Sequence, residues 1–415
     1  MKRLPIGGML SVLLVVGIAL GGGGEPVKYS PVGLPAAPKP PPCWAHMSSA
    51  APRPNTTVYV RVTSWGSTRI TTVAYYQSGK VIHEAVTDPR YGRTSIAYAV
   101  GGAPVGFTVH IIVWAYKNGR QGHCFTSFTP TLPLAALPVP KNLRPFSSGA
   151  PRTDGVWHRA GRPVAGHAAV YETTLQPPGS PFEAGIAWMD TNLLRAQLYS
   201  GSGSPGGYGW KYTAPIQPSA ALSLVAAFNG GFKFPASQGG YYSEGRLVYP
   251  LRNGGASLVI YRNGSATVGQ WGRDVTMSRD VVAVRQNLTL LVDHGRAVSG
   301  LNPDDTYAWG ATLGGVPNVW RSGIGVTANG ALVYVYGPSL RITQLAALLV
   351  RAGAVRAMTL DMNPYWVVFA TYSPSPSTAA AAPANGRDLL GGTMQGPSTF
   401  FEPSWTRDFF TLSAR

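Results

Sequence analysis

The sequence predicts two folded parts in one chain, an all-β sandwich followed by a larger α+β domain. Short β-branched and aromatic runs with turn signals between them fill residues 55–129, which indicates the sandwich. In residues 153–415 strands alternate with few helices, and one helical pattern leads directly into a strand, which favours the α+β class. Two Pro-rich stretches, residues 25–54 and 130–152, precede and follow the sandwich and are expected to be linkers.

The N-terminal segment, residues 1–24, predicts the compartment. Lys2 and Arg3 precede an uncharged stretch whose apolar centre, residues 9–20, has the length of a signal peptide and not of a spanning helix. Four glycines lengthen the uncharged run and no Ala-x-Ala site is present, so an uncleaved membrane anchor stays open. Both alternatives place the rest of the chain outside the cytoplasm, either secreted or tethered to the cell membrane.

The first strand-rich region carries its clearest runs at residues 58–62, 71–76 and 107–116. Turn dipeptides such as Ser-Gly and Asn-Gly separate such runs. About seven short strands in about 75 residues are typical of an immunoglobulin-like or fibronectin-like sandwich.

The chain has two cysteines, Cys43 and Cys124. No Cys-x-x-Cys or clustered His accompanies them, so they make a poor metal site. A structural disulfide is the favoured interpretation, and it would tie the Pro-rich segment to the end of the sandwich.

The charge balance predicts the kind of partner. The sequence has 34 Lys and Arg against 17 Asp and Glu, a formal net charge of +17. Such an excess favours polyanions, and we expect an anionic cell-wall polymer or a membrane surface. Nucleic acid is not expected, because the basic residues are scattered singly and no zinc-finger, RRM or basic-helix signature occurs.

The α+β domain is expected to contain one clear helix. Apolar residues repeat at helical spacing at Leu345, Leu348, Leu349 and Ala352. Gly353 is suited to end this helix. This helix leads into the strand that ends at residue 361. Further strands are expected at residues 184–190, 224–228, 256–261, 281–284, 288–292, 331–336 and 355–361.

Residues 224–232 predict a buried strand that runs into a polar turn. The continuous apolar run 224–228 is what a strand covered on both faces needs. Asn229, Gly230 and Gly231 then free the backbone for positive φ and allow another molecule to approach closely. An ordinary hairpin turn is the alternative, since Asn-Gly is a common turn dipeptide.

Four motifs in the C-terminal part occur in one order, at residues 229–232, 239–246, 321–325 and 357–361. This series resembles the phosphodiester glycosidase family, and the resemblance runs from about residue 155 to the C-terminus. It implies a phosphodiester glycosidase-like α+β domain and a hydrolase of the glycoside hydrolase type. The family usually continues its last Asp as Asp-Gly-Gly-Gly-Ser, whereas here Asp361 is followed by Met-Asn-Pro-Tyr-Trp.

Two carboxylates are the candidate catalytic residues, Asp361 and Glu244. Glycoside hydrolysis usually needs a pair of carboxylates for proton transfer and charge stabilisation. Asp361 ends an apolar strand and matches the family's Asp, while Glu244 lies in a Gly-rich loop. The structural alternatives are a cap or turn for Asp361 and a solvated turn for Glu244.

The resemblance also implies residues that bind the substrate. Asn229, with the following glycines, matches the family's Asn and is expected to orient the sugar. The guanidinium of Arg321 suits bidentate phosphate binding, and a surface ion pair is the alternative. Arg285 interrupts an apolar strand, as a residue in a bulge or in a cleft would. We expect Arg321, Asn229 and Asp361 to line one pocket. The candidate substrate-binding residues are Asn229, Gly230, Gly231, Arg321, Arg285, Asn363 and Trp366.

These observations predict an extracytoplasmic hydrolase that cleaves a sugar 1-phosphodiester in cell-envelope or exopolysaccharide glycans. The changed motif after Asp361 keeps open a non-catalytic glycan-binding envelope protein on the same fold. A structural adhesion module led by the sandwich is a third reading. No Walker, His-Glu-x-x-His, Gly-x-Ser-x-Gly or EF-hand sequence occurs, so we expect neither cofactor nor metal.

Overall fold

The computed structural model describes residues 39–53, 55–87, 91–101, 104–131, 135–305, 307–375 and 377–415, apart from the side chain of Leu313. The chain divides into two compact units, Met1–Leu132 and Pro133–Arg415. The predicted signal peptide or anchor, residues 1–24, and residues 25–38 and 54 of the first linker lie outside the described residues. Within the described ranges, no helix is long and apolar enough to cross a membrane.

The first unit consists of two antiparallel sheets, ordered β1-β2-β5 and β4-β3-β6-β7. Alternate residues of its strands point inward, as the burial of Val58, Val60 and Val62 along β2 shows. These side chains and their counterparts on β3, β5 and β6 form one apolar core between the sheets. The immunoglobulin-like or fibronectin-like label stays a prediction. The strands are β1 (Trp44–Met47), β2 (Thr57–Thr63), β3 (Arg69–Tyr76), β4 (Gly79–Val86), β5 (Arg93–Ala99), β6 (Val109–Lys117) and β7 (Arg120–Phe128).

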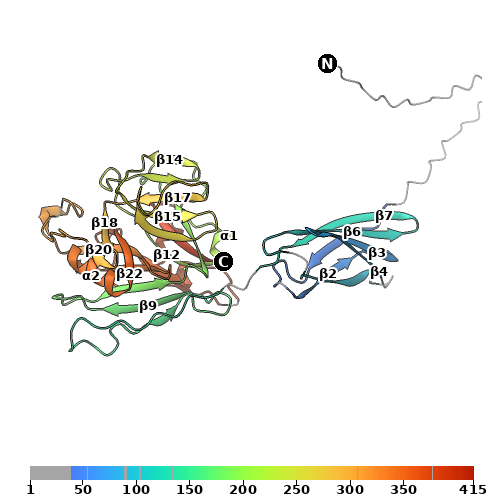
Figure 1. Cartoon of the computed structure of the whole chain (residues 1–415), viewed down its shortest axis with the longest axis horizontal. Helices are drawn as coiled ribbons and strands as arrows, with labels where there is room; N and C mark the ends of the chain where they lie inside the picture. Colours follow the sequence, from blue (N-terminus) through green and yellow to red (C-terminus); the bar gives the residue numbers. More distant parts are fainter. Residues whose placement is uncertain are drawn as a thin grey trace, which may run out of the picture. The chain divides into compact units, whose positions relative to one another are not determined.

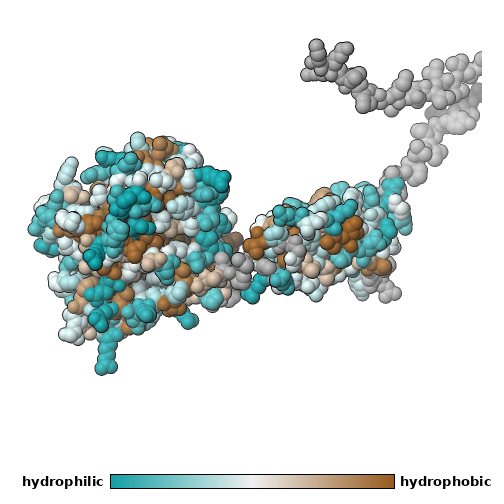
Figure 2. Space-filling view, in the orientation of Figure 1, coloured by the Kyte–Doolittle hydropathy of each residue, from teal (hydrophilic) through white to brown (hydrophobic). Residues whose placement is uncertain are grey.

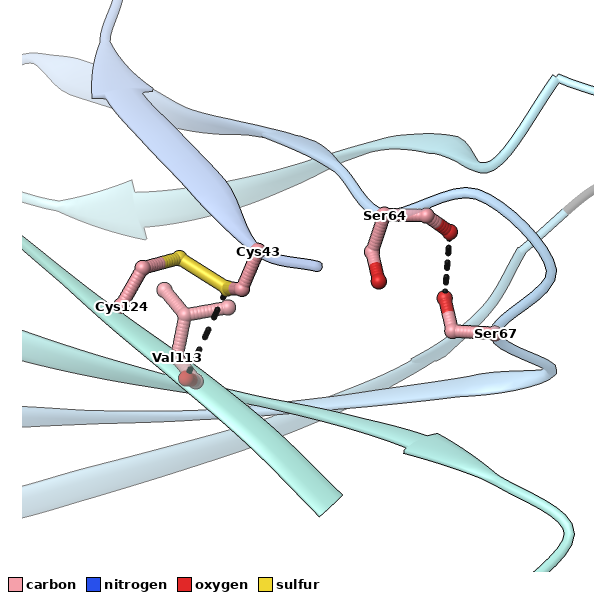
Figure 3. Close-up of a disulfide and its surroundings, with 5 residues drawn as sticks. All are labelled: Cys43, Ser64, Ser67, Val113 and Cys124. Carbon is pink, nitrogen blue, oxygen red and sulfur yellow. Dashed lines mark hydrogen bonds between the residues drawn. A yellow bond between two sulfur atoms is a disulfide. The ribbon is translucent and has the colours of Figure 1, made fainter. Parts of the chain in front are cut away.

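The predicted disulfide is confirmed. Cys43, immediately before β1, is bonded to Cys124 on β7, with the two Cα atoms 5.5 Å apart (Figure 3). The bridge therefore joins the start of the three-stranded sheet to an edge strand of the four-stranded sheet.

The second unit is built from three antiparallel sheets. The eight-stranded sheet has the order β19-β18-β22-β20-β21-β10-β9-β8, and the two five-stranded sheets have the orders β11-β25-β12-β23-β24 and β14-β13-β17-β15-β16. The strands are β8 (His158–Ala160), β9 (Val170–Leu175), β10 (Ala184–Met189), β11 (Leu194–Tyr199), β12 (Leu224–Asn229), β13 (Tyr241–Ser243), β14 (Arg246–Tyr249), β15 (Ala256–Tyr261), β16 (Ala266–Gln270), β17 (Val281–Gln286), β18 (Leu290–Asp293), β19 (Arg296–Ala297), β20 (Val319–Thr327), β21 (Leu332–Leu340), β22 (Ala354–Met362), β23 (Phe369–Tyr372), β24 (Gly386–Asp388) and β25 (Phe409–Ala414).

The predicted helix is present, but the α+β class is not confirmed because the unit is mostly β-sheet. Helix α2 (Ile342–Arg351) packs Leu345, Leu348 and Leu349 on the eight-stranded sheet, beside β20 and β22 (Figure 1). The other helices within the described ranges are single short turns, α1 (Pro218–Ala221), η1 (Leu313–Gly315), η2 (Pro383–Asn385) and η3 (Thr399–Phe401). The paired strands of this unit are antiparallel, and antiparallel strands need no helical crossover between them.

Strand β12 lies between two apolar clusters, which explains its continuous apolar run. Ala226 and Phe228 belong to the cluster shared by the three sheets, whereas Leu224 and Ala227 belong to a second cluster with Phe400. Every residue of β12 is buried, as predicted for a strand covered on both faces. This burial fixes the position of the polar turn that follows.

Part of the segment predicted as the second linker packs on the second unit. Leu137, Leu143 and Phe146 contact the apolar cluster beneath α2. The backbone N–H of Leu137 also donates to the carboxylate of Asp190 at 2.7 Å.

Both units expose hydrophobic as well as hydrophilic side chains on the face drawn in Figure 2, consistent with only 12% charged residues.

Glu172 on β9 gives the fold a predictable dependence on pH. Its buried carboxylate accepts a hydrogen bond from Thr371, and burial raises its pKa from 4.5 to about 7, although Arg387 opposes this. The folded state therefore holds the proton more tightly than the unfolded state, so this group's contribution to stability falls as pH rises from about 4.5 to 7.

We expect Glu172→Gln to raise the free energy of unfolding at pH 8 by about 1–3 kcal/mol and to change little at pH 4. The amide has no charge to desolvate and still accepts the bond from Thr371. Chemical denaturation at both pH values measures this, with the exposed Glu183→Gln as the matched control. Equal shifts for the two variants at pH 8 would contradict the assignment.

Candidate active site

Asp361, near the end of β22, lines a cavity of the second unit. The side chain is almost buried, with 6% of the residue exposed, and the cavity has a volume of about 530 Å³. The backbone holds Asp361 in place, because its N–H donates to the carbonyl of Gly230 at 3.0 Å and its carbonyl accepts from Ser322 at 2.6 Å. The wall consists of Phe232, Lys233, Pro235, Ala236, Gln238, Tyr307, Gly310, Ala311, Asp361, Met362, Asn363, Trp366 and Arg407.

Arg407 is the cation that pairs with Asp361 in this cavity. Its Nη2 forms an ion pair with Oδ2 of Asp361 and also donates to the carbonyl of Gly231 at 3.0 Å. The guanidinium carbon lies 4.6 Å from the centroid of the Trp366 ring. Arg407 is therefore held between a carboxylate and an aromatic face, while its buried Nε has no hydrogen-bond partner among the described residues.

The environment tunes Asp361 for proton transfer near neutral pH. Burial raises the pKa of its carboxyl from 3.8 to about 6, while Arg407 acts in the opposite direction. A carboxyl group with a pKa near the working pH exchanges a proton efficiently. At pH 7 the group is mostly ionised and can accept a proton or stabilise a developing positive charge.

The segment after Asp361 closes one side of the cavity. Asn363 adopts a positive φ of 73° and its N–H donates to the carbonyl of Trp320 at 2.9 Å. This turn brings Trp366 onto the cavity wall, where the ammonium of Lys233 lies 5.9 Å from its ring centroid. The aromatic wall residue Trp366 thus lies one position beyond the four residues that stand where the family usually has Gly-Gly-Gly-Ser.

Asn229 lies behind the cavity and not on its wall. Its Oδ1 accepts from the hydroxyl of Tyr334 at 2.6 Å and from the N–H of Val368 at 3.2 Å. Its Nδ2 donates to Ser322 at 3.1 Å, and that hydroxyl donates to the carbonyl of Asp361. The expectation that Asn229 orients a sugar is thereby corrected, since its polar atoms are engaged in positioning the end of β22.

Gly230 and Gly231 are needed for close packing of this protein's own side chains. Neither residue has positive φ, and neither lines the cavity. A Cβ on Gly230 would lie 2.1 Å from Oδ2 of Asp408, and one on Gly231 would lie 3.0 Å from the guanidinium carbon of Arg285. The predicted close approach is therefore made by buried side chains and not by a ligand.

We expect Gly230→Ala to lower the free energy of unfolding by about 1–3 kcal/mol, the usual cost of overpacking. The new methyl group must displace Asp408, which lies in a closely packed environment. Gly391→Ala is the control, because a Cβ at Gly391 meets no atom within 4 Å and its φ is not positive. Equal stability of the two variants in urea denaturation would show that Asp408 moves aside freely.

Arg285 forms a buried ion pair and does not reach the cavity. Its Nε donates to Oδ2 of Asp408 at 2.8 Å, and both side chains are fully buried. The remaining donors go to the carbonyls of Gln286, at 2.7 Å, and Phe232. All three nitrogens are engaged, so the expected contact of Arg285 with substrate is corrected to a structural role beneath the cavity floor.

Arg321 is also buried away from the cavity. Its guanidinium donates to the carbonyls of Leu340 at 3.0 Å, Trp309 at 2.9 Å and Pro317 at 3.4 Å. Burial lowers its pKa to about 10. Arg321 therefore fixes the loop that carries part of the cavity wall, and the prediction that it shares a pocket with Asp361 is wrong.

Glu244 lies in the turn between β13 and β14 and not at the cavity. Its φ is 53°, and its carboxylate accepts hydrogen bonds from the backbone N–H groups of Lys211 and Tyr212, both at 2.9 Å. The structure does not bring Glu244 together with Asp361. Of the sequence-predicted site residues, it places Asp361, Asn363 and Trp366 on one wall.

Sequence reasoning missed Arg407 and Lys233 as site residues. Arg407 follows Trp405 and Thr406, in a segment that lies outside the four motifs of the series. A signal was present, because an Arg-Asp pair among aromatic residues is unusual in a chain with 12% charged residues. Within the described part of the chain, no group of His, Cys, Asp and Glu is arranged to hold a metal ion.

Comparison with known proteins agrees with the motif series. Residues 223–361 match the family model described as phosphodiester glycosidase. This matched region begins just before β12 and ends at Asp361, so it includes both strand ends that position the carboxylate. No curated protein matches the chain.

Two solved structures illustrate the structural likeness. The catalytic domain of zebrafish N-acetylglucosamine-1-phosphodiester alpha-N-acetylglucosaminidase, auto-inhibited by its pro-peptide, is 15% identical, with a TM-score of 0.39 over 67% of this chain and 97% of that one. A hypothetical protein from Synechocystis is 11% identical, with a TM-score of 0.33 over 90% of this chain and 76% of the other. At these scores neither likeness bears on activity. The match over residues 223–361 shows that the chain carries a domain of the phosphodiester glycosidase family.

Proposed function

We propose that the second unit hydrolyses the bond between an anomeric carbon and phosphate in a sugar 1-phosphodiester. The observation that carries this proposal is the buried pair of Asp361 and Arg407 at one cavity, with Nε of Arg407 left without a partner. The pair offers a carboxylate for the sugar side of the bond and a cation for the phosphate side.

This reaction needs little help from a general acid. When the bond between C1 and oxygen breaks, the electron pair leaves with the phosphate, whose conjugate acid is already strong. Charge-assisted hydrogen bonds from Arg407, with help from the ammonium of Lys233, can stabilise that leaving group. A water molecule supplies the oxygen at C1, and ionised Asp361 accepts its proton.

The proposed setting is outside the cytoplasm, on phosphate-bearing glycans of the cell envelope or exopolysaccharide. The disulfide between Cys43 and Cys124 supports an oxidising compartment. The net charge of +17 favours an anionic substrate. Trp366 lines the cavity beside the Asp361 pair, and an aromatic side chain there suits contact with the C–H groups of a sugar ring.

Incubation of the full chain with a UDP-sugar or a p-nitrophenyl sugar phosphodiester in ¹⁸O-water tests the proposal. Cleavage at C1 places the label in the free sugar and leaves the phosphate product, UDP or p-nitrophenyl phosphate, without label. Label in the phosphate would show cleavage of the P–O bond and would refute the assignment to a glycosidase.

A glycan-binding protein without catalysis is the second candidate. The observation that favours it is that Asp361 is the single carboxylate among the described wall residues, and it is already paired. No turnover of these substrates, together with a change in Trp fluorescence when a sugar 1-phosphate is added, would favour this candidate.

A further inference from the structure

The outer face of the β1-β2-β5 sheet carries a groove of about 580 Å³. Cross-strand pairing places His46, Arg61 and Ser95 in one row across the three strands. The neighbouring row contains Thr63 and Arg93, which also line the groove. Side chains of one row point to the same face, so this surface is continuous over β1, β2 and β5.

This groove is cationic. Arg61 and Arg93 lie diagonally across neighbouring strands, and neither forms an ion pair with another described residue. The sequence between residues 39 and 131 holds nine Lys or Arg and two acids, Glu84 and Asp88. Glu84 lies on β4 of the other sheet, and Asp88 lies outside the described residues. The potential of the groove is therefore set by two guanidinium groups with few described counter-charges.

An exposed aromatic pair borders the same groove. Trp44 pairs with Thr63 across β1 and β2, and its ring centroid lies 5.3 Å from that of Trp65. The two residues are 53% and 56% exposed, although burial of such rings would be favourable. Cys43, immediately before Trp44, is fixed by its disulfide to Cys124, which anchors the start of this strand (Figure 3).

Backbone packing also holds Trp65 in its turn. The hydroxyl of Ser67 donates to the carbonyl of Ser64 at 2.8 Å, and the N–H of Ser64 donates to the carbonyl of Gly92 at 2.6 Å. Gly92 has a φ of 56°, and a Cβ there would lie 2.4 Å from the carbonyl oxygen of Ser64. The ring is thus presented from a fixed turn, which lowers the entropy lost when it contacts a partner.

We propose that this groove, with Trp44 and Trp65 at its border, binds an anionic polysaccharide. Arg61 and Arg93 contact the anionic groups, and the indole rings pack against the C–H faces of sugar rings. The disulfide favours a polysaccharide over nucleic acid as the polyanion, because disulfides are typical of oxidising compartments. The surface does not depend on catalysis by the second unit.

Isothermal titration calorimetry of dextran sulfate binding to the full chain, at about 0.15 M salt, tests this site. The double variant Arg61→Gln/Arg93→Gln is expected to bind about tenfold more weakly, as expected for lost charge-assisted hydrogen bonds. Trp44→Ala is expected to bind dextran sulfate about three- to tenfold more weakly, but to bind inorganic polyphosphate as wild type does.

The matched control is Arg53→Gln/Lys80→Gln, which removes the same charge from exposed positions away from the groove. It is expected to bind dextran sulfate within about twofold of wild type at this salt concentration, because distant charges are screened. An equal loss in the control would attribute binding to net charge alone and overturn the site. Tighter, Arg61-dependent binding to phosphatidylglycerol vesicles would replace the polysaccharide with a membrane surface.

Discussion

Asp361→Asn is expected to lower turnover of a sugar 1-phosphodiester by about 10²-fold or more, the scale of a lost acid–base group. The amide keeps the size of the side chain but cannot accept the proton of water. In the wild type, turnover should rise with pH through about 6, where the carboxyl ionises. The variant should lose this limb of the profile, which is measured with the same substrate between pH 4 and 8.

The same change carries a cost in stability, which the sequence alone did not predict. Asn leaves the guanidinium of Arg407 without its counter-charge, but it also removes a buried carboxylate whose pKa is raised, so the net cost should be smaller than the about 3–5 kcal/mol typical of a broken buried ion pair. Arg407→Gln in the same chain removes that unpaired charge. The double variant Asp361→Asn/Arg407→Gln should therefore recover stability while staying inactive, which separates the loss of catalysis from the loss of folding.

Glu183→Gln is a suitable control for activity, since Glu183 is exposed and does not line the cavity. A folded Asp361→Asn variant that turns over substrate at the wild-type rate would dismiss Asp361 as the reacting carboxylate. A wild-type chain with no turnover would direct attention to the glycan-binding candidate.

The position of Asp361 could be predicted from sequence because a single strand determines it. A mostly apolar stretch after the helical pattern predicted β22, and a carboxylate near the end of a buried strand lies at a sheet edge where a cavity can form. Strand β12 was predicted on the same grounds. These predictions need only local periodicity, which sequence patterns carry well.

Polar residues near those strand ends were harder to assign. Asn229 and Arg321 occupy positions that motif order places near Asp361, yet their side chains turn to carbonyl and hydroxyl groups inside the protein. Buried polar groups must find partners, and the partners here come from distant segments. Sequence order therefore identified the neighbourhood but could not say which side chains face the cavity.

Arg407 is the opposite case, a residue that lines the cavity although the sequence motifs did not identify it. It pairs with Asp361 across 46 positions of sequence, and its location depends on β25 aligning with β12. No local pattern encodes that register. Glu244 was chosen because a second carboxylate was expected. Its carboxylate instead accepts hydrogen bonds from the backbone N–H groups of Lys211 and Tyr212, so it ties the β13–β14 turn to that segment.

Arg285→Met is expected to lower the free energy of unfolding by about 3–5 kcal/mol. The change leaves the carboxylate of Asp408 buried and without its cation. Asp408→Asn alone should also destabilise the protein, since it leaves the guanidinium without its counter-charge. Together the two changes remove both charges, so their combined cost should be at least about 2 kcal/mol less than the sum of the single costs.

The exposed pair of Arg273 and Asp293 is the control for this double-mutant cycle. Its atoms are equally close, at 2.8 Å, but the side chains are 41% and 20% exposed. Solvent screens such a pair, so Arg273→Met with Asp293→Asn should show a coupling below about 1 kcal/mol. Urea denaturation of all variants measures both cycles. The free energy of unfolding of Arg285→Met could instead lie within about 1 kcal/mol of the wild-type value while the variant loses substrate affinity. That result would show that Arg285 reaches the substrate and that the ion pair is not what holds Asp408 beneath the cavity.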